Sequence, residues 1–367
     1  MRIRIILFVF SSCLFANEIN VGIVGYTLLD SFKIFCDDSA EVVLDGKRIS
    51  YRDFGIDSNG FLIVEDKEII FNEIAIRTQG ITTFLSGKGY QPYRGNFLIT
   101  YDNSLKIINI VNEDIYLSSV LGSEMGANFE DEALKAQLLC IKAFLDIRKE
   151  RNKHKKWDIL NTAMVMAYRG EEYSSDRMFA LVDELKEIKL ILPDDMEPLF
   201  FSTASGYIIS QECFSSTFDS PPNNPLILLE DNKTSPYYHF SLTLSEIELM
   251  ELIDSIIPVL DIKQISLKLF NNTECVDFIG FSDSDDRIFW LKGYKFVSLI
   301  QRKYGAIFKS IQFSVYKENS IFEFSGKGFG HFIGLSQYGA QEMALNNKSY
   351  QEILFKFFPG SKISGNS

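Results

Sequence analysis

The stretch from Tyr116 to Lys149 constrains the fold of this chain more than any other, because its apolar residues keep one period over several turns. Four of them recur at steps of four, three and four residues: Leu134, Leu138, Ile141 and Leu145. That spacing places side chains on one face of an α-helix. Acidic residues crowd the start of the segment and basic residues its end, as the helix dipole favours. The pattern predicts a long amphipathic helix that turns one face to the core.

One carboxylate stands in the segment that leads into this helix. We predict a strand from Tyr116, then a tight turn that holds Glu124, then the helix with Asn128 as its N-cap. Asp131, three residues after Asn128, completes a capping-box-like pair. A turn fixed between a strand and a capped helix is rigid, which is what a reactive side chain requires.

Composition limits the partners of the chain. Its 367 residues are enough for one large domain or two moderate ones, and 46% of them are hydrophobic. The formal net charge is -12, whereas binding to a nucleic-acid backbone needs clustered Lys and Arg. We therefore expect no nucleic-acid partner.

The first sixteen residues, MRIRIILFVFSSCLFA, have the pattern of a secretory signal peptide: two arginines, an apolar run and small residues near Ala16. Lipid attachment at Cys13 is the less favoured alternative, because a strand is predicted to start at Ile19 and leaves little tether. No later apolar run is long enough to span a membrane. We expect an exported protein of the periplasm or cell envelope that contacts a membrane only through its N-terminal segment.

Four cysteines follow the predicted signal peptide: Cys36, Cys140, Cys213 and Cys275. None of them forms a CxxC pair, so a cysteine-rich zinc site is not indicated. Cys140 lies in the amphipathic segment, where a buried free thiol is expected. A disulfide from Cys36 to Cys213 or to Cys275 stays open.

The segment from Ile19 to Asn112 consists of short β-branched and aromatic runs broken by turn residues, and the long helical segment follows it. A run of strands followed by helices predicts an α+β fold. We expect a signal peptide at 1–16, a β-rich part at 17–115, a catalytic core at 116–360 and a polar tail at 361–367. Asp45-Gly46 and Asn59-Gly60 are hairpin signals. Apart from the central helix, helical periods are found at 174–189, 242–253, 295–304 and 350–357.

Few residues have the spacing of known catalytic motifs. The three histidines lack metal-site spacing, no GxSxG elbow is present, and GKGFGHFIG does not match GxGxxG. In addition to Glu124, one glycine-rich segment is a candidate. It carries neutral hydrogen-bonding and aromatic groups: His331, Ser336, Gln337 and Tyr338. Such groups suit a neutral sugar polymer, although a purely structural turn accounts for the same composition.

The longest motifs resemble those of one family. GKGFGHFIGLSQYGAQEMA followed by YQEILFKFFPG is similar to the C-terminal signature of the stage II sporulation protein D family, also called the SpoIID/LytB domain. The segments YLSSVLGSEM and EDEALKAQ resemble its glutamate block, and FFSTASGY resembles its STSGG turn. YRGNFLI and Asn112 also fit. The similarity extends from about Ile19 to Lys362.

The resemblance implies a lytic transglycosylase, an enzyme that cleaves peptidoglycan glycan strands without water. It implies that Glu124 is the catalytic acid and base. Because the sugar's own hydroxyl attacks and leaves a 1,6-anhydro ring, one residue can protonate the leaving oxygen and then accept the hydroxyl proton. A hydrolase would need a second carboxylate. Met125 and Phe129 are candidates for an apolar wall beside Glu124.

The resemblance also places the substrate-binding residues, with some departures from the family. His331, Ser336, Gln337 and Tyr338 are expected to line the glycan cleft, with Ser202 and Thr203 on a facing turn. Lys142 stands where the family has arginine, which keeps the charge but loses bidentate recognition. Phe332 replaces a family glycine. Zinc-binding members have a Cys/His cluster between the catalytic helix and the turn at Tyr168, where this chain has Leu160 and Met164 and no cysteine, so we predict no metal and no cofactor.

Two other functions stay open. A non-catalytic peptidoglycan-binding or scaffold protein of the same fold would keep the cleft without cutting, and protein partners in the cell envelope would then matter more. A sugar hydrolase would pair Glu124 with a second carboxylate, for which Glu113, Asp114 and Glu132 are the candidates.

Overall fold

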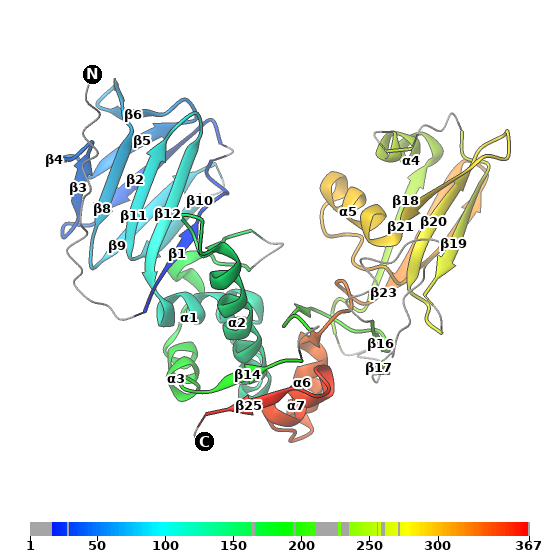
Figure 1. Cartoon of the computed structure of the whole chain (residues 1–367). Coiled ribbons are helices and arrows are strands. Elements are labelled where there is room, and N and C mark those ends of the chain that lie inside the picture. Colours follow the sequence, from blue (N-terminus) through cyan, green and yellow to red (C-terminus); the bar gives the residue numbers. More distant parts are fainter. Residues whose placement is uncertain are drawn as a thin grey trace. The chain divides into compact units, whose positions relative to one another are not determined.

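The computed structural model describes residues 17–27, 29–87, 89–162, 166–193, 196–209, 227–228, 235–254, 256–257, 261–270 and 272–365. They form two compact units (Figure 1). The first comprises Met1–Asn128 and Leu145–Lys186, and the second comprises Phe129–Phe144 and Glu187–Ser367. Strands and helices occur in both, so the predicted α+β class is confirmed. The division of the chain at Tyr116 stays a prediction.

Two sheets dominate the first unit. The larger has the order β13 (Ile159–Leu160), β1 (Glu18–Gly22), β12 (Leu105–Asn112), β11 (Asn96–Tyr101), β8 (Glu73–Arg77), β3 (Glu41–Leu44) and β4 (Lys47–Ile49). The other has the order β10 (Gly89–Arg94), β9 (Ile81–Ser86), β2 (Ser31–Cys36), β5 (Asp53–Asp57), β6 (Phe61–Val64) and β7 (Lys67–Ile70). Pairing is antiparallel, apart from the parallel contact of β1 with β13.

Aromatic side chains join the two sheets. Phe84 of β9 is fully buried, and its ring centroid lies 4.9 Å from Phe97 of β11 in the other sheet and 5.8 Å from Phe32 of β2. The ring of Tyr93 of β10 packs edge-on against Phe84 and Phe97, with ring centroids 5.5 Å and 5.8 Å apart. Burial of each phenylalanine contributes about 2–3 kcal/mol, so this cluster holds the sandwich together.

The predicted hairpins of this unit are confirmed. Asp45 and Gly46 connect β3 to β4 with φ values of 46° and 80°, as a type I′ turn requires. Gly60, with φ of 80°, ends the turn between β5 and β6.

The segment after β12 is a helix, so the predicted strand at Tyr116 is wrong. Helix α1 spans Glu113–Glu124, and the side chain of Asn112 caps it by accepting a hydrogen bond of 2.8 Å from the Asp114 N–H. Its buried apolar residues are Tyr116, Leu117, Val120 and Leu121. Their steps of one, three and one residue follow the helical period, and the cap fixes where the helix starts.

Helix α2 spans Asp131–Asn152, and Phe129–Phe144 and Leu145–Asn152 belong to different units. The four residues of its predicted apolar face are fully buried: Leu134, Leu138, Ile141 and Leu145. Ala133, Ala136 and Gln137 are also fully buried, so this helix is central on several faces. Because α2 begins at Asp131, Asn128 does not cap it, and the predicted capping box is wrong.

Shorter helices complete the first unit. The 3₁₀ helix η1 covers Gly170–Tyr173, and α3 covers Asp176–Glu184 with Ser175 as N-cap. The helix predicted at 174–189 is therefore present but ends at Glu184, and it buries Met178, Leu181 and Val182 as expected. Both elements pack against α1.

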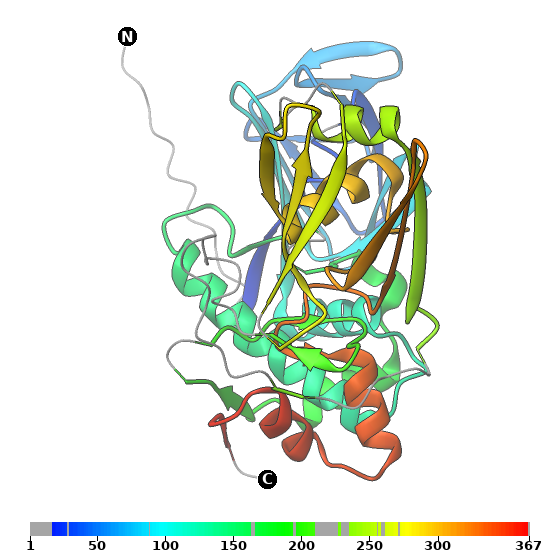
Figure 2. The same ribbon diagram turned by 90° about the vertical axis from the view of Figure 1, so that its right-hand side faces the viewer.

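The second unit contains several small sheets. They pair β14 (Lys189–Ile191) with β25 (Lys362–Ser364), β15 (Phe200–Phe201) with β24 (Leu335–Ser336), and β16 (Tyr207–Ile208) with β17 (Ile227–Leu228). Two three-stranded sheets have the orders β18 (His239–Ser245), β23 (Ile321–Lys327), β22 (Phe313–Glu318) and β19 (Gln264–Leu269), β20 (Val276–Ser282), β21 (Ile288–Lys292). Figure 2 shows the yellow and orange strands of the two three-stranded sheets.

Helix α5 (Gly293–Tyr304) holds the core of these three-stranded sheets. Its Phe296 is fully buried and lies 5.9 Å from Phe281 of β20 and 5.5 Å from Phe324 of β23. The helix predicted at 295–304 is thus confirmed. At 242–253 only Glu246–Ile253 is helical (α4), because the preceding residues pair with β23 as strand β18.

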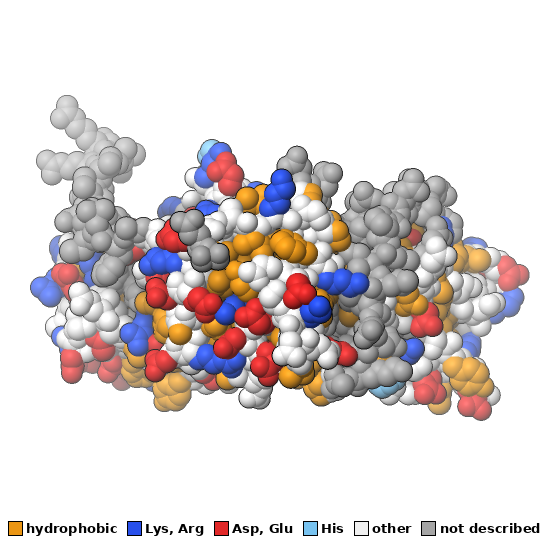
Figure 3. All heavy atoms as spheres, turned by 90° about the horizontal axis from the view of Figure 1, so that it is seen from below, with side chains coloured by type: hydrophobic (Ala, Val, Ile, Leu, Met, Phe, Trp, Pro, Cys, Tyr) orange, Lys and Arg blue, Asp and Glu red, His pale blue; other side chains and the backbone are white. Residues whose placement is uncertain are grey.

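The C-terminal segment holds α6 (Gln337–Leu345) and α7 (Tyr350–Phe357), the second of which was predicted. The predicted polar tail at 361–367 contains strand β25, which pairs with β14. No helix of the described residues is long and apolar enough to cross a membrane. The face drawn in Figure 3 intersperses acidic with basic side chains.

The cysteines bear on one open alternative. Cys36 is a half-buried free thiol, and Cys140 is a fully buried one, as expected. Cys36 and Cys275 therefore form no disulfide with each other, so that alternative is wrong. Cys213, Cys13 and the predicted signal peptide lie outside the described residues.

Candidate active site

Glu124 is the last residue of α1 and is half-buried in the first unit. One of its carboxylate oxygens, Oε1, accepts a hydrogen bond of 2.8 Å from the backbone N–H of Ala167. The dipole of α1 disfavours negative charge at this end of the helix, and no basic residue in its last turn offsets that effect. The hydrogen bond from the Ala167 N–H stabilises the charged form of Glu124. The sequence predicted that Glu124 lies in a turn after a strand. The structure instead places it at the C-terminus of a helix.

Two buried tyrosines lie beside this carboxylate. Tyr116 is fully buried with its ring centroid 5.1 Å from that of Tyr168, and its hydroxyl has no hydrogen-bond partner among the described residues. Burial, and then the nearby Tyr168 and Glu124, raise the pKa of Tyr116 well above its ordinary value. Its hydroxyl therefore stays neutral. Met125, expected to form an apolar wall, is 6% exposed, whereas Phe129 belongs to the second unit.

A buried asparagine fixes the segment that holds Glu124. The Tyr168 hydroxyl donates a hydrogen bond of 2.7 Å to Oδ1 of Asn109, which is fully buried in β12. The Asn109 amide in turn donates to the carbonyl oxygens of Arg94 and Asn96 at 3.0 and 3.1 Å. Every hydrogen-bonding atom of this side chain is thus in use, and Ala167 is positioned next to an anchored tyrosine.

Close backbone contact completes this support. A Cβ at Gly122 would lie 2.0 Å from the Tyr173 carbonyl oxygen, so only glycine lets η1 approach α1 here. The Ser119 hydroxyl donates to the Gly170 carbonyl oxygen across the same contact. The segment from Ala167 to Tyr173 is therefore bound to the helix that carries Glu124.

The other candidate carboxylates are engaged elsewhere. Glu113 pairs with Lys149 at 2.5 Å and Asp114 with Lys186 at 3.6 Å, both at the start of α1. Ten or eleven helical residues separate them from Glu124, which is about 15 Å along the axis. A two-carboxylate glycosidase needs about 5–9.5 Å. Glu132 accepts a hydrogen bond of 2.7 Å from the Tyr350 N–H within the second unit.

The glycine-rich motif lies in the second unit and packs on the Ser202–Thr203 turn. Strand β24 runs parallel to β15, and Thr203 forms a β-bridge with Phe329. The fully buried Ser336 caps α6 by accepting from the Gly339 N–H at 3.2 Å, and it also accepts from the Ala204 N–H at 3.1 Å. Its hydroxyl thus holds two backbone segments together.

His331 is half-buried beside Phe201, with ring centroids 5.7 Å apart. Its Nδ1 accepts a hydrogen bond of 3.1 Å from the Ile333 N–H. Burial lowers the pKa of His331 to about 4, so the imidazole is neutral near pH 7. A neutral ring suits hydrogen bonding to an uncharged ligand.

Phe332 has a left-handed backbone conformation, which glycine adopts more easily than other residues. Its φ is 61°, its side chain is fully buried, and its ring lies 5.5 Å from that of Phe201. A Cβ at Gly328 would lie 2.7 Å from the Phe332 ring, so that ring fills the space over Gly328. The carbonyl oxygen of Phe332 accepts from the Ile209 N–H at 2.7 Å. The side chain is therefore part of the core.

The remaining predicted residues differ in exposure. Tyr338 is half-buried, its N–H donates to the Ser202 carbonyl oxygen at 2.9 Å, and its ring lies 5.2 Å from Phe129. Gln337 is 7% exposed. Lys142 of α2 donates to the Ile188 carbonyl oxygen at 2.9 Å. Within the second unit the structure thus brings Ser202, Thr203, Ser336 and Tyr338 together.

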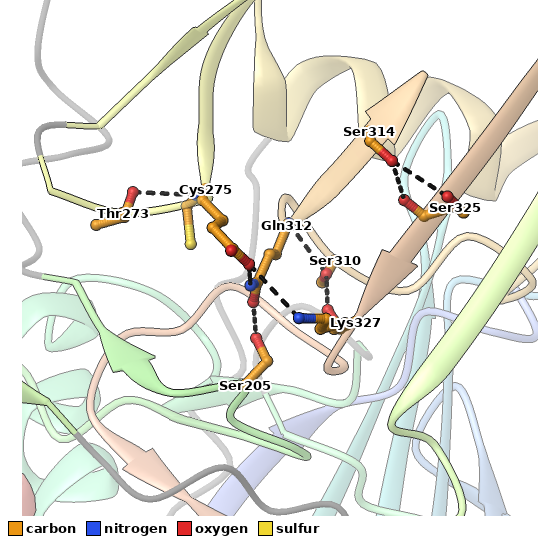
Figure 4. A network of polar contacts seen from close by, with 9 residues as sticks. Ser205, Thr273, Cys275, Ser310, Gln312, Ser314, Ser325 and Lys327 are labelled. Carbon is orange, nitrogen blue, oxygen red and sulfur yellow. Dashed lines mark hydrogen bonds and ion pairs between the residues drawn. The ribbon is translucent and has the colours of Figure 1, made fainter. Parts of the chain in front are cut away.

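A polar network extends from this turn into the neighbouring sheets (Figure 4). The Ser205 hydroxyl donates to the Gln312 side-chain oxygen, and the Gln312 amide donates to Glu274 at 2.7 Å. Glu274 lies 3.6 Å from Lys327, at the start of the glycine-rich motif. Ser205 and Gln312 are 2% and 3% exposed, so the network positions the turn and the motif strand.

Sequence reasoning missed Asn109, Tyr116 and the Ala167 N–H. The sequence could have indicated Asn109, because it is a polar residue inside the apolar run IINIV of a strand. No sequence feature indicates the role of the Ala167 backbone N–H. Glu124 belongs to the first unit and His331 to the second, so their meeting at one glycan cleft stays a prediction. Among the described residues no group of three His, Cys, Asp or Glu could hold a metal ion.

Comparisons with known proteins place this arrangement in a family. Residues 101–189, which include α1, α2 and α3, match the family model described as SpoIID, stage II sporulation protein. The chain is 27% identical over 270 residues to Stage II sporulation protein D of Bacillus amyloliquefaciens, covering 68% of this chain and 73% of that protein. It is 24% identical over 309 residues to an uncharacterized protein of Brachyspira hyodysenteriae, covering 82% and 81%.

A shorter match concerns an amidase enhancer of Bacillus subtilis. It is 45% identical over 58 residues, which are 16% of this chain and 8% of that protein. Together, the match to the family model and the similarity to a Stage II sporulation protein D support the assignment of the chain to the stage II sporulation protein D family, which the motifs predicted.

Proposed function

We propose that this protein is an exported lytic transglycosylase that cleaves peptidoglycan glycan strands with Glu124 as its single acid and base. The observation that carries the proposal is the position of Glu124: a half-buried carboxylate at a helix end that accepts a hydrogen bond from the Ala167 N–H, while Glu113 and Asp114 lie about 15 Å away along the same helix. A mechanism with one carboxylate suits a reaction in which the sugar supplies the nucleophile. The amidase enhancer similarity supports a role at the cell wall.

In the proposed reaction the Glu124 carboxyl group first gives its proton to the glycosidic oxygen that leaves. The resulting carboxylate then accepts the proton of the sugar's 6-hydroxyl as that oxygen closes the 1,6-anhydro ring. The proton is returned to Glu124, so no water is consumed. The neutral groups His331, Gln337 and Tyr338, with Ser202 and Lys142, are proposed to bind the glycan. Ser336 and Thr203 are proposed to shape that surface, because both are fully buried.

The test is incubation of the purified protein with glycan strands, with and without stem peptides, followed by mass spectrometry of the products. Strands that end in 1,6-anhydromuramyl groups are expected from the wild type and not from Glu124→Gln. Reducing ends without an anhydro ring would instead indicate a hydrolase. Co-sedimentation with peptidoglycan by a folded wild type that forms no product would indicate the non-catalytic binding function.

A further inference from the structure

A cavity of about 290 Å³ lies in the first unit, beside the segment that holds Glu124. Its walls come from the chain between β1 and β2, from the β9–β10 hairpin and from the residues before η1. Four tyrosines line it: Tyr26, Tyr90, Tyr93 and Tyr168. Polar side chains share the lining: Ser86, Gln91, Asn161, Arg169 and Glu172. Such a combination of aromatic walls with a few polar groups is typical of small-ligand sites.

The tyrosines differ in their freedom to move. Tyr26, Tyr93 and Tyr168 are buried, and the Tyr93 ring lies 5.8 Å from Tyr168. Tyr90, in contrast, is 69% exposed, with its ring 6.4 Å from that of Phe35. Three rings therefore form a fixed wall, and the fourth presents an aromatic face to solvent at an edge strand.

The polar groups are held in place and balance each other in charge. Asn161 accepts a hydrogen bond of 2.8 Å from the Val24 N–H, which orients its amide. The Gln91 amide donates to the Arg169 carbonyl oxygen and lies 3.5 Å from Glu172. With one guanidinium and one carboxylate, the cavity favours neither anions nor cations. Amide, guanidinium and carboxylate groups together can donate to and accept from hydroxyl groups.

We infer that this cavity binds one pyranose ring of the glycan substrate, as a subsite apart from the Glu124 carboxylate. This inference rests on the proposed function. A pyranose has an apolar C–H face that can lie on an aromatic ring and an equatorial edge of hydroxyl and amide groups. The Tyr90 ring stacks on the apolar face of the sugar. The side chains of Gln91, Asn161 and Glu172 form hydrogen bonds with the groups at its edge.

The subsite is connected to the carboxylate through the backbone. Tyr168 and Arg169, which line the cavity, directly follow Ala167, whose N–H donates to Glu124. A sugar bound on these residues therefore contacts the segment that holds the acid and base. Occupancy of the cavity keeps a long glycan in place while Glu124 acts on it, so short strands should be poorer ligands than long ones.

The experiment is isothermal titration with chitotetraose and chitohexaose in the Glu124→Gln background, where no cleavage interferes. Tyr90→Ala should weaken binding of chitohexaose by about three- to tenfold, the loss of one aromatic contact. Glu172→Ala should weaken it as well. Tyr51→Ala is the matched control, since Tyr51 is also an exposed tyrosine of this unit but does not line the cavity. Its affinity should equal that of the parent.

Equal affinities for the Tyr90→Ala and Tyr51→Ala proteins, or no heat of binding with either sugar, would overturn the subsite. If Tyr90→Ala does not fold, the Glu172→Ala titration decides in its place. The proposed function fails separately: binding that depends on Tyr90, together with a wild type that forms no anhydro ends, would keep the subsite and exclude the transglycosylase.

Discussion

The backbone N–H of Ala167 donates a hydrogen bond of 2.8 Å to the Glu124 carboxylate, although 43 residues separate the two in the chain. The residue next to Ala167, Tyr168, is itself fixed by Asn109 of strand β12. The carboxylate at the end of α1 is therefore oriented by the sandwich as well as by its own helix. Orientation of this kind is what a single acid and base needs, because one group must serve two proton transfers.

Replacement of Glu124 by glutamine should remove glycan cleavage while the fold is kept. The glutamine oxygen can still accept from the Ala167 N–H, so the free energy of unfolding should change by less than about 1 kcal/mol. The cleavage rate should fall by about 10²–10⁴-fold, because neither proton transfer remains. Release of anhydro products, followed by mass spectrometry, measures the rate, and urea unfolding measures the stability.

Asp114→Asn is the matched control for this experiment. Asp114 lies at the other end of α1 and pairs only weakly with Lys186, at 3.6 Å. Its replacement should leave cleavage within about twofold of the wild type, as expected for a surface change. A loss as large as that of Glu124→Gln would contradict a mechanism with one carboxylate.

Tyr168→Phe should destabilise the first unit and disturb the position of Ala167. The change removes the hydroxyl that donates to the buried Asn109 oxygen and leaves that acceptor without a partner, which costs about 1–3 kcal/mol. The glycan-cleavage rate should fall with KM little changed. Tyr173→Phe is the comparison, because the Tyr173 hydroxyl only accepts an exposed bond from Arg169 at 3.3 Å. Equal stabilities of the two variants would argue against the buried anchor.

Phe332→Gly restores the residue that the family has, yet it should destabilise the protein. Glycine relieves the left-handed backbone at φ of 61°, worth about 1 kcal/mol, but loss of a fully buried phenylalanine costs about 3–5 kcal/mol. Denaturant unfolding should therefore show a net loss of at least about 2 kcal/mol. Asn319→Gly has a similar φ of 57° at an exposed turn and should change stability by less than about 0.5 kcal/mol. A stabilised Phe332→Gly protein would show that backbone strain outweighs packing.

His331 should make the stability depend on pH between about 6.5 and 4. Burial lowers the pKa of His331 in the folded state to about 4, so over this range the unfolded chain binds a proton that the folded chain does not. Stability from this group is complete above pH 6.5, falls as the pH decreases, and is fully lost below pH 4. The loss should approach about 3 kcal/mol. His331→Gln lacks the titrating group, so the difference between the two unfolding curves isolates the effect. Parallel curves would contradict a neutral His331 imidazole in the folded protein.

The periodic and capped segments could be predicted from the sequence. Helices α3, α5 and α7 follow their apolar periods, and Asp45-Gly46 forms the expected type I′ turn, because local chemistry suffices there. The strand at Tyr116 was wrong because a short apolar run fits either period, and the Asn112 cap decided for a helix. His239–Ser245 became strand β18 because it pairs with β23, which is a contact far along the chain.

Sequence alone determined which residues carry the family motifs, and hence that Glu124 and the glycine-rich segment are the places to examine. It did not determine how they are held. The Ala167 N–H, the Asn109 anchor and the burial of Phe332 depend on which distant backbone atoms meet after folding. Hydrogen bonds and close packing act over a few ångströms in space, and residue order along the chain does not specify those distances.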